Sequence, residues 1–124
     1  MSDNKKTVLM IEDDSFLRKL YRDKFAKEEI HFIEATNGVE GINKIVNEKP
    51  DLIILDILLP SKGGFDVLEE KNKSEETKDI PVIILSNLGQ EADIEEGKEL
   101  GVENYFVKSE VNFTEVVDKV KDLL

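Results

Sequence analysis

Hydrophobic residues in this chain gather in five short runs, separated by longer stretches with helical periodicity. The runs are rich in Val, Ile and Leu and have few polar interruptions, which is typical of parallel strands that are buried on both faces. Strands and helices therefore alternate in five βα units, and the pattern predicts an α/β domain with a doubly wound sheet. The runs begin near Thr7, Ile30, Asp51, Ile80 and Glu103.

The stretches between the runs predict amphipathic helices. After the first run, Leu17, Tyr21 and Phe25 recur at a spacing of four residues and fall on one helix face. A second helix ends before Pro50, since proline disfavours the helical conformation in the residue before it. Its predicted apolar face consists of Val39, Ile42, Ile45 and Val46.

Two short motifs predict where helices begin. Asn37-x-x-Glu40 and Asn112-x-x-Glu115 resemble capping boxes, in which two side chains satisfy free N–H groups of the first turn. The second motif opens a helix at the C-terminus. Its apolar face consists of Val116, Val117, Val120, Leu123 and Leu124.

The helix predicted from Gln90 to Leu100 is the weakest. Its apolar contacts are Ala92, Ile94 and Leu100, and Gly97 lies in its interior. A glycine there costs about 1 kcal/mol relative to alanine. The segment is therefore either a marginal surface helix or an element that can move.

Four of the five runs end at polar residues of different kinds. They are Glu12-Asp13-Asp14, Asp56, Ser86 and Lys108. Asp56 stands in the most apolar stretch of the chain, where a lone ionised carboxylate would cost several kcal/mol. Because the carboxyl ends of parallel strands lie at one edge of a sheet, we expect these residues to form a single site with partners for Asp56.

Three carboxylates at adjacent strand ends require a cation to remain ionised. Oxygen ligands without His or Cys favour Mg²⁺, with manganese or calcium as alternatives. Asp13 and Asp56 are the expected direct ligands, the carbonyl of Leu58 a third, and Glu12 the holder of a metal-bound water. Taken alone, the acids before the first helix could equally be helix caps, the role expected of Asp14.

Length and composition predict one domain over residues 1–124, with residues 1–6 as a polar tail and no room for an output domain. The chain has a net charge of -11 and no cysteine. The charge argues against nucleic acid or an anionic membrane as partner, and favours cations and basic protein surfaces. The sequence has neither a run long enough to span a membrane nor a recognisable secretion signal, so we expect a cytoplasmic protein.

Taken together, these features resemble the receiver domain of two-component response regulators. The resemblance rests on motifs that are weak singly but specific in this order and spacing. It implies a three-layer, flavodoxin-like fold with five helices and a five-stranded parallel sheet of strand order 2-1-3-4-5. The motifs are residues 8–14 with Leu17-Arg18, residues 50–56 with Pro60 and Gly64, residues 81–86, and Gly101 with residues 105–108.

The resemblance also implies a role for each site residue. Asp56 would accept a phosphoryl group from a sensor histidine kinase or a histidine phosphotransfer protein. Mg²⁺ and Lys108 would neutralise the phosphoryl oxygens, and Ser86 would donate its hydroxyl to the product phosphate. Ser86 and Tyr105 would then move as a switch and change the surface formed by the fourth helix, fifth strand and fifth helix. The downstream protein is unknown, and the switch would be a monomer or a homodimer that forms on phosphorylation.

The chain departs from the family at Ser109, where the family usually has proline after the lysine. A cis bond before a residue other than proline costs about 2.5–4 kcal/mol, so we expect a trans peptide bond between Lys108 and Ser109. Two residues after Asp56 and Ser86 stand Leu58 and Leu88. Neither side chain can orient an attacking water and both can exclude it, which predicts slow loss of the phosphoryl group.

Two other interpretations belong to different functional classes. A haloacid-dehalogenase-type phosphatase also uses an aspartate nucleophile and Mg²⁺, but it needs a second acid where this chain has Leu58. A pure interaction module would not need the complete set of polar residues at the strand ends. We therefore expect a switch that catalyses only its own phosphorylation and dephosphorylation. His31, the one histidine, is expected to be a structural or surface residue.

Overall fold

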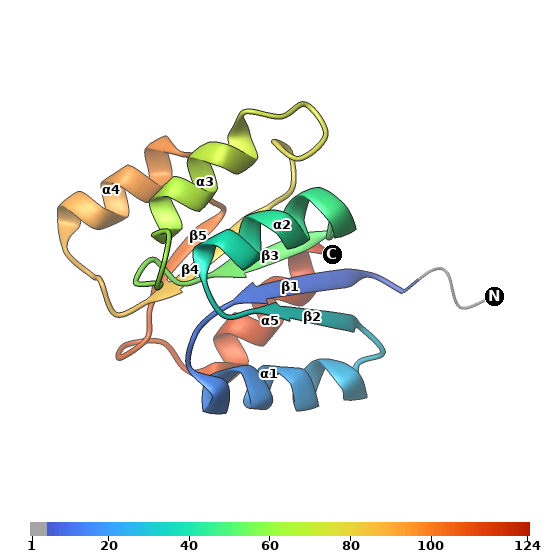
Figure 1. Cartoon of the computed structure of the whole chain (residues 1–124). Helices are drawn as coiled ribbons and strands as arrows, with labels where there is room; N and C mark the ends of the chain where they lie inside the picture. The colour runs from blue at the N-terminus through green and yellow to red at the C-terminus, as the bar shows by residue number, and fades with distance from the viewer. Residues whose placement is uncertain (1–4) are drawn as a thin grey trace.

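A computed structural model of the chain describes residues 5–124, which form five strands and five helices (Figure 1). Each strand begins within two residues of its predicted start. Residues 1–4 of the predicted polar tail lie outside the described part. The strands are β1 (Thr7–Ile11), β2 (His31–Ala35), β3 (Leu52–Leu55), β4 (Val82–Ser86) and β5 (Asn104–Val107). The helices are α1 (Ser15–Lys27), α2 (Gly38–Glu48), α3 (Gly64–Asn72), α4 (Glu91–Glu99) and α5 (Phe113–Leu123).

The strands form one parallel sheet in the order β2-β1-β3-β4-β5, which confirms the predicted fold. The order reverses at β1, because the chain first runs outward to β2 and then returns to β3 on the other side. Ile11 pairs with Leu55 in the β1–β3 register. The Asp56 N–H donates to the Ile11 carbonyl at 3.1 Å, so the residues that follow both strands leave the sheet side by side.

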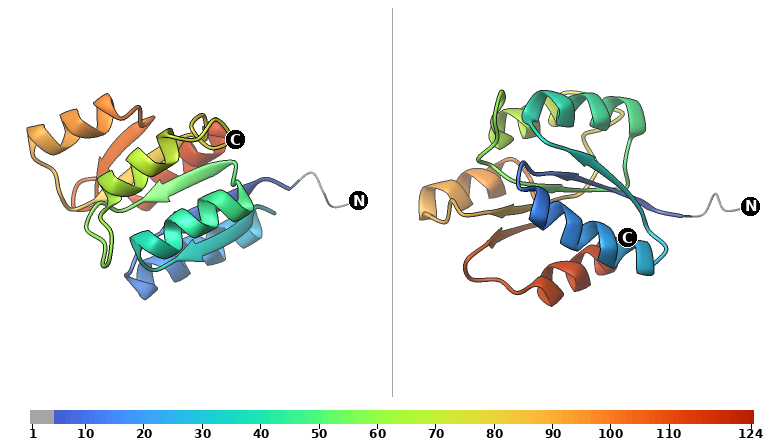
Figure 2. Two further views of the ribbon diagram at one scale, coloured as in Figure 1. Left: turned by 45° about the horizontal axis from the view of Figure 1, so that its top comes forward. Right: turned by 60° about the horizontal axis from the view of Figure 1, so that its bottom comes forward.

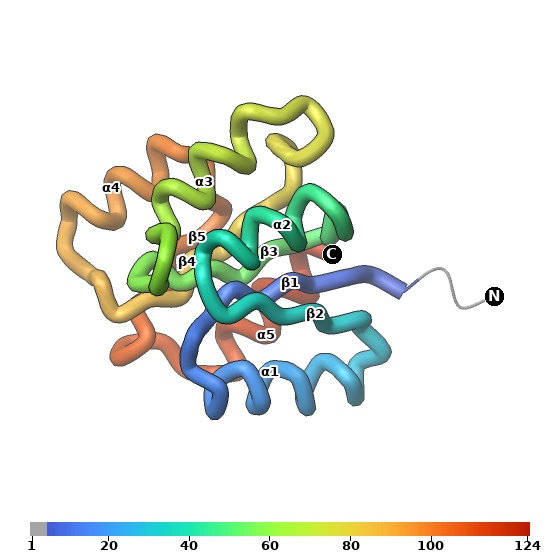
Figure 3. Tube along the Cα trace, viewed as in Figure 1, coloured from blue at the N-terminus to red at the C-terminus, as the bar shows by residue number. Residues whose placement is uncertain are grey.

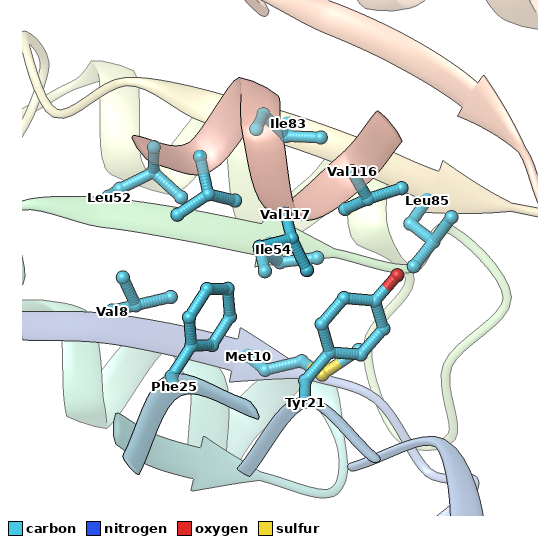
Figure 4. Close-up of a cluster of buried hydrophobic side chains, with 11 residues drawn as sticks. Val8, Met10, Tyr21, Phe25, Leu52, Ile54, Ile83, Leu85, Val116 and Val117 are labelled. Atoms are coloured by element: carbon cyan, nitrogen blue, oxygen red, sulfur yellow. The ribbon is translucent and has the colours of Figure 1, made fainter. Parts of the chain in front are cut away.

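The helices cover both faces of the sheet (Figure 2), with α1 and α5 on one face and α2, α3 and α4 on the other. On the first face, Tyr21 and Phe25 of α1 pack with Val117 of α5 over Met10 and Ile54 (Figure 4). All five are at least 98% buried. Each large side chain of this kind contributes about 1.5–3 kcal/mol when fully buried. Within residues 5–124, no helix is both long enough and apolar enough to cross a bilayer.

The polar residues before α1 and α5 cap these helices as predicted. Asp14 accepts hydrogen bonds from the N–H groups of Phe16 and Leu17 at 2.9 and 3.2 Å. Asn112 and Glu115 form the complete capping box of α5. Side-chain acceptors of this kind satisfy N–H groups that the first helical turn leaves free.

The caps of α2 and α4 differ from the predicted ones. Asn37 accepts from the Glu40 N–H at 2.9 Å, but the Glu40 carboxylate accepts from Thr36 instead of closing the box on Asn37. At α4 the structure contains a box that was not predicted, between Gln90 and Asp93. Glutamine is an uncommon helix cap, so the sequence carried little signal for it.

The apolar face predicted for α2 is wrong at two positions. Val39 and Val46 expose 48% and 53% of their surface, whereas Ile45 is buried. The helix approaches the sheet through glycine, since a Cβ on Gly41 would lie 2.7 Å from Cδ1 of Ile11. Because the closest approach is made by a residue without a side chain, hydrophobic periodicity misplaces the inward face.

Helix α4 is one residue shorter at each end than predicted, and Ala92 is exposed rather than a core contact. Gly97 is the residue that α4 buries. A Cβ at this position would lie 3.0 Å from Cδ2 of Tyr105 and 3.2 Å from Cδ1 of Ile84. The glycine therefore has a packing role, because it lets the helix lie close to β4 and β5.

Candidate functional site

The carboxyl ends of β1 and β3 bring three predicted site residues together. Glu12 and Asp13 follow β1, Asp56 follows β3, and one carboxylate oxygen from each lies within 4.8 Å of the others. Glu12 and Asp56 are buried, whereas Asp13 is exposed. The Cα trace shows the loops that carry them at the same edge of the sheet (Figure 3). This is the switch point at which ligands bind in open α/β sheets.

Lys108, which follows β5, reaches the same place and supplies the counter-charge expected for Asp56. Its Nζ donates to Oδ2 of Asp56 at 2.9 Å and lies 2.9 Å from Oε1 of Glu12. Burial lowers the pKa of the Lys108 ammonium, but its bonds to the two carboxylates outweigh burial and raise that pKa overall. Lys108 is therefore a firmly protonated partner for both acids.

Glu12 is the more deeply buried of the two acids, at 1% exposure. Burial raises the pKa of its carboxyl, and the negative charge of Asp56 acts in the same direction. Lys108 and the Asp14 N–H, which donates to Oε2 at 3.1 Å, lower this pKa without reversing the rise. Within the described residues, Oε1 of Glu12 receives no directed hydrogen bond despite its contact with the ammonium.

This arrangement fits a hard divalent cation. The cluster contains three carboxylates and one ammonium, so one positive charge faces up to three negative ones. Oxygen donors without His or Cys suit Mg²⁺. The loop after β3 bends back onto the site, since the Leu58 N–H donates to Oδ1 of Asp56 at 3.1 Å. Metal coordination by the Leu58 carbonyl stays a prediction.

Ser86 and Tyr105 are linked through the backbone of Leu88. Ser86 is fully buried at the end of β4, and its Oγ accepts from the Leu88 N–H at 3.3 Å. The Tyr105 hydroxyl donates to the Leu88 carbonyl. Burial raises the pKa of Tyr105 to about 12, with smaller contributions from the charges of Asp93 and Asp56. Ser86 and Tyr105 therefore share one hydrogen-bond partner, and their movement stays a prediction.

Two glycines hold the loop after Asp56 in its tight path. A Cβ on Gly64 would lie 2.5 Å from the Asp56 carbonyl oxygen and 2.6 Å from Cα of Ile57. A Cβ on Gly38 would lie 1.9 Å from the Lys62 carbonyl oxygen. Both contacts are with backbone, which cannot give way as a flexible side chain can. The loop is therefore fixed between β3 and the start of α2.

The peptide bond between Lys108 and Ser109 is trans, as predicted. The Lys108 N–H donates to the Ser86 carbonyl at 2.9 Å. This bond continues the β4–β5 pairing by one residue and directs the lysine side chain toward Asp56. Lys108 thus reaches the site without a proline after it.

Arg18 touches the site, and sequence reasoning gave it no role beyond its place in the motif. It extends from α1 and donates to the backbone carbonyl of Glu12 at 2.9 Å. The sequence offered no signal for this contact, because its acceptor is a backbone carbonyl, a group present at every residue. His31 is exposed at the start of β2, in agreement with its predicted role.

Comparisons with known proteins agree with this geometry. The chain matches the response regulator receiver domain family over residues 8–121. It is 32% identical over 117 residues to sporulation initiation phosphotransferase F of Bacillus subtilis, covering 94% of this chain and 92% of the relative. It spans less than half the length of three other curated relatives, 41% to 44% of each.

Solved structures share the fold over nearly the whole chain. A response regulator of Chloroflexus aurantiacus superposes with a TM-score of 0.87 and 25% identity, covering 97% of this chain and 98% of that one. The Mn²⁺-bound form of response regulator Rcp1 superposes with a TM-score of 0.81 and 28% identity, covering 95% and 91%. The chain belongs to the receiver domain family of two-component response regulators.

Proposed function

We propose that this protein is a phosphorylation-activated switch that accepts a phosphoryl group on Asp56 from a sensor histidine kinase or a histidine phosphotransfer protein. The observation that carries the proposal is the hydrogen bond from Lys108 to a buried Asp56, beside the carboxylates of Glu12 and Asp13. A structural ion pair needs only one acid. Two further carboxylates at the same place favour a site that transfers a charged group.

In the proposed step, an Asp56 carboxylate oxygen forms a bond to phosphorus as the P–N bond of a phosphohistidine breaks. The electron pair of that bond returns to the imidazole nitrogen of the donor. Negative charge is spread over the phosphoryl oxygens in the loose transition state. Lys108 already contacts Asp56 Oδ2 and can move its contact to a phosphoryl oxygen. Ser86 would donate its hydroxyl to the product.

Asp13, Asp56 and the Leu58 carbonyl would hold Mg²⁺, with Glu12 holding a metal-bound water. When bound, the ion adds positive charge beside the phosphoryl oxygens. Two observations support this assignment. The carboxylate oxygens lie within 4.8 Å of one another, and the related regulator Rcp1 was solved in a Mn²⁺-bound form.

A groove beside the site would receive the phosphodonor protein. It has a volume of about 220 Å³, and its lining includes Leu20, Phe113, the helix cap Asp14 and the site residue Lys108. Leu20 is 41% exposed and the neighbouring Phe16 is 69% exposed. Large apolar side chains exposed together mark interaction surfaces, and continuity with the site favours the donor as occupant.

Phosphorylation would be read out on the surface formed by α4, β5 and α5. If Ser86 turned toward a phosphate, it would release the Leu88 N–H, and Leu88 also accepts from Tyr105. A second groove, of about 260 Å³, is lined by Tyr105, Ile94 and other residues of this surface. The net charge of -11 favours a downstream partner with a basic surface. Homodimerisation on phosphorylation is the alternative output.

The test is incubation of the purified chain with Mg²⁺ and acetyl phosphate or phosphoramidate, followed by intact mass spectrometry. Wild type should gain one phosphoryl group, and Asp56→Ala should gain none. Asp13→Asn should gain it slowly because a metal ligand is lost. Equal phosphorylation of Asp56→Ala, or none of folded wild type, would refute the proposal.

The same experiment separates the two alternatives. A phosphorylation-independent interaction module would gain no mass, and a phosphatase would turn over an external phosphate ester. The phosphatase is disfavoured because Leu58 occupies the position of the second acid. The interaction module is disfavoured because Asp56, Ser86 and Lys108 are all present together with Glu12 and Asp13.

A further inference from the structure

Arg18 is a largely buried cation on α1 with two different partners. Its Nη1 donates to the backbone carbonyl of Glu12 at 2.9 Å, and its Nε donates to Oε1 of Glu34 on β2 at 2.9 Å. The side chain is 14% exposed. The planar guanidinium therefore bridges the β1–α1 loop and the edge strand, a geometry that a point charge such as lysine cannot reproduce.

A second arginine fixes the acid that holds Arg18. Arg22, one turn further along α1, donates to both oxygens of Glu34 at 2.7 and 2.8 Å. Glu34 is 24% exposed and Arg22 is 46% exposed. The two arginines thus share one carboxylate, but Arg18 also contacts the backbone of Glu12.

The Glu12 carbonyl belongs to the peptide plane that precedes Asp13. The plane that follows Asp13 is also held, because the Asp14 N–H donates to Oε2 of Glu12 at 3.1 Å. Since peptide groups are planar, fixing both planes fixes the two backbone dihedral angles of Asp13. The direction of the Cα–Cβ bond of Asp13 is then fixed, and with it the region of space that its carboxylate can reach. Arg18 supplies one of these two restraints.

We propose that Arg18 is a positioning residue that orients Asp13 for binding Mg²⁺, through its hydrogen bond to the Glu12 carbonyl. The inference rests on the proposed function, which makes Asp13 a metal ligand. Groups that orient metal ligands typically change metal affinity by 10–100-fold when lost. Arg18 acts indirectly, through a peptide plane, and supplies only one of the two restraints on Asp13. We therefore expect its loss to weaken Mg²⁺ binding by about fivefold to tenfold.

The charge of Arg18 acts in the opposite direction, because a cation close to the acids repels Mg²⁺. A neutral substitution would mix the two effects. Arg18→Lys keeps the charge and removes the two-pronged contact. Arg22→Lys is the matched control. It makes the same arginine-to-lysine change one turn away, at a residue that also binds Glu34 but does not contact Glu12.

The experiment measures Mg²⁺ affinity of wild type, Arg18→Lys and Arg22→Lys by calorimetry, with backbone amide shifts recorded in metal-free protein. We expect about fivefold to tenfold weaker binding for Arg18→Lys, with shifted Asp13 and Asp14 amides. Arg22→Lys should bind within twofold of wild type. Glu34→Gln weakens the ion pair with Arg18 but leaves the Arg18 contact with Glu12 in place, so its Mg²⁺ affinity should be intermediate. This variant replaces Arg18→Lys in the test if Arg18→Lys does not fold.

Equal affinity of folded Arg18→Lys and wild type would overturn the inference, and so would equal weakening by both lysine variants. Displaced amides with unchanged affinity would also overturn it, since they show a structural role alone. If wild type binds no Mg²⁺, the proposed function fails instead. These outcomes are distinguishable because the wild-type measurement does not depend on Arg18.

Discussion

The centre of the sheet and its β5 edge are built differently. At the centre, the site residues follow β1 and β3, in which every residue except Thr7 is buried, and glycines place backbone directly against backbone at Gly38 and Gly64. On the other side, α4 buries Gly97, and its neighbour β5 has every residue only partly buried. At Gly97 the nearest atoms belong to side chains rather than to backbone.

Under the proposed function, this difference would separate the chemistry from the readout. Phosphoryl transfer requires carboxylates and a cation held in fixed positions, and the tight packing around β1 and β3 would provide this. A signal requires a part of the molecule that changes at low free-energy cost, and elements with few buried apolar contacts provide it. The four predictions below test this contrast, from the largest expected effect to the smallest.

Gly64→Ala and Gly97→Ala should differ strongly in the free energy of unfolding. The first places a Cβ 2.5 Å from the Asp56 carbonyl oxygen, and overpacking against rigid backbone should cost about 3 kcal/mol. The second gains helix propensity of about 1 kcal/mol and loses a similar amount against Tyr105, so its net effect should be near zero. Urea unfolding measures both. Equal losses would contradict the contrast between the centre of the sheet and its β5 edge.

Lys108→Ala should destabilise the metal-free protein by about 2 kcal/mol. Removing one partner of a fully buried ion pair costs about 3–5 kcal/mol, and the cost should be smaller here because the site is open on one side. The variant should also gain more stability from added Mg²⁺ than wild type does, since a competing cation is gone. Unfolding in Mg²⁺ and in a chelator measures this. Lys119→Ala on α5 is a control that should respond to Mg²⁺ as wild type does.

Leu58→Asn and Leu88→Gln should each shorten the lifetime of the phosphorylated state by about tenfold. This is less than the roughly 10²–10⁴-fold contribution of a general base, because an amide can orient a water but does not take its proton. Leu58 is 54% exposed, so a polar side chain can be accommodated there without unfolding. The decay of phosphorylated protein, followed by intact mass after removal of the donor, gives the rate. Unchanged decay in both variants would remove the water-exclusion hypothesis.

Tyr105 should titrate at pH about 12 rather than at the ordinary 10.0, an effect that leaves stability near neutral pH unchanged and is therefore the smallest at that pH. The raised pKa favours the neutral phenol in the folded state. Its contribution to stability is therefore complete below pH 10.0 and is lost as the pH rises through about 12. Absorbance titration of Tyr21→Phe isolates Tyr105. Adding Gly97→Ala should move the midpoint toward 10.0 by displacing the ring.

Sequence reasoning predicted the sheet and the residues at its strand ends well. Runs of Val, Ile and Leu define parallel strands with little ambiguity, and parallel pairing then brings Asp13, Asp56 and Lys108 together. It was less successful wherever glycine makes the close contact. At Gly41 and Gly97 the residue in contact has no side chain, so hydrophobic periodicity placed Val39 and Ala92 inward.

The network around Arg18 could not have been predicted either. Its contact with Glu12 depends on a backbone carbonyl, and carbonyls are present at every residue and carry no sequence signal. Its contact with Glu34 joins α1 to an edge strand 16 residues away. Only the folded arrangement distinguishes this arginine from the surface cations along the same helix.

The position of Lys108 between Glu12 and Asp56 has a consequence for how the protein is made. Two buried acids without a counter-ion would make folding depend on capturing a metal first, as in small zinc domains. Here the chain carries its own ammonium to the site, so a newly synthesised molecule can mature before it meets a divalent ion. Under the proposed function, metal loading would then be a reversible step of signalling rather than a condition of biogenesis.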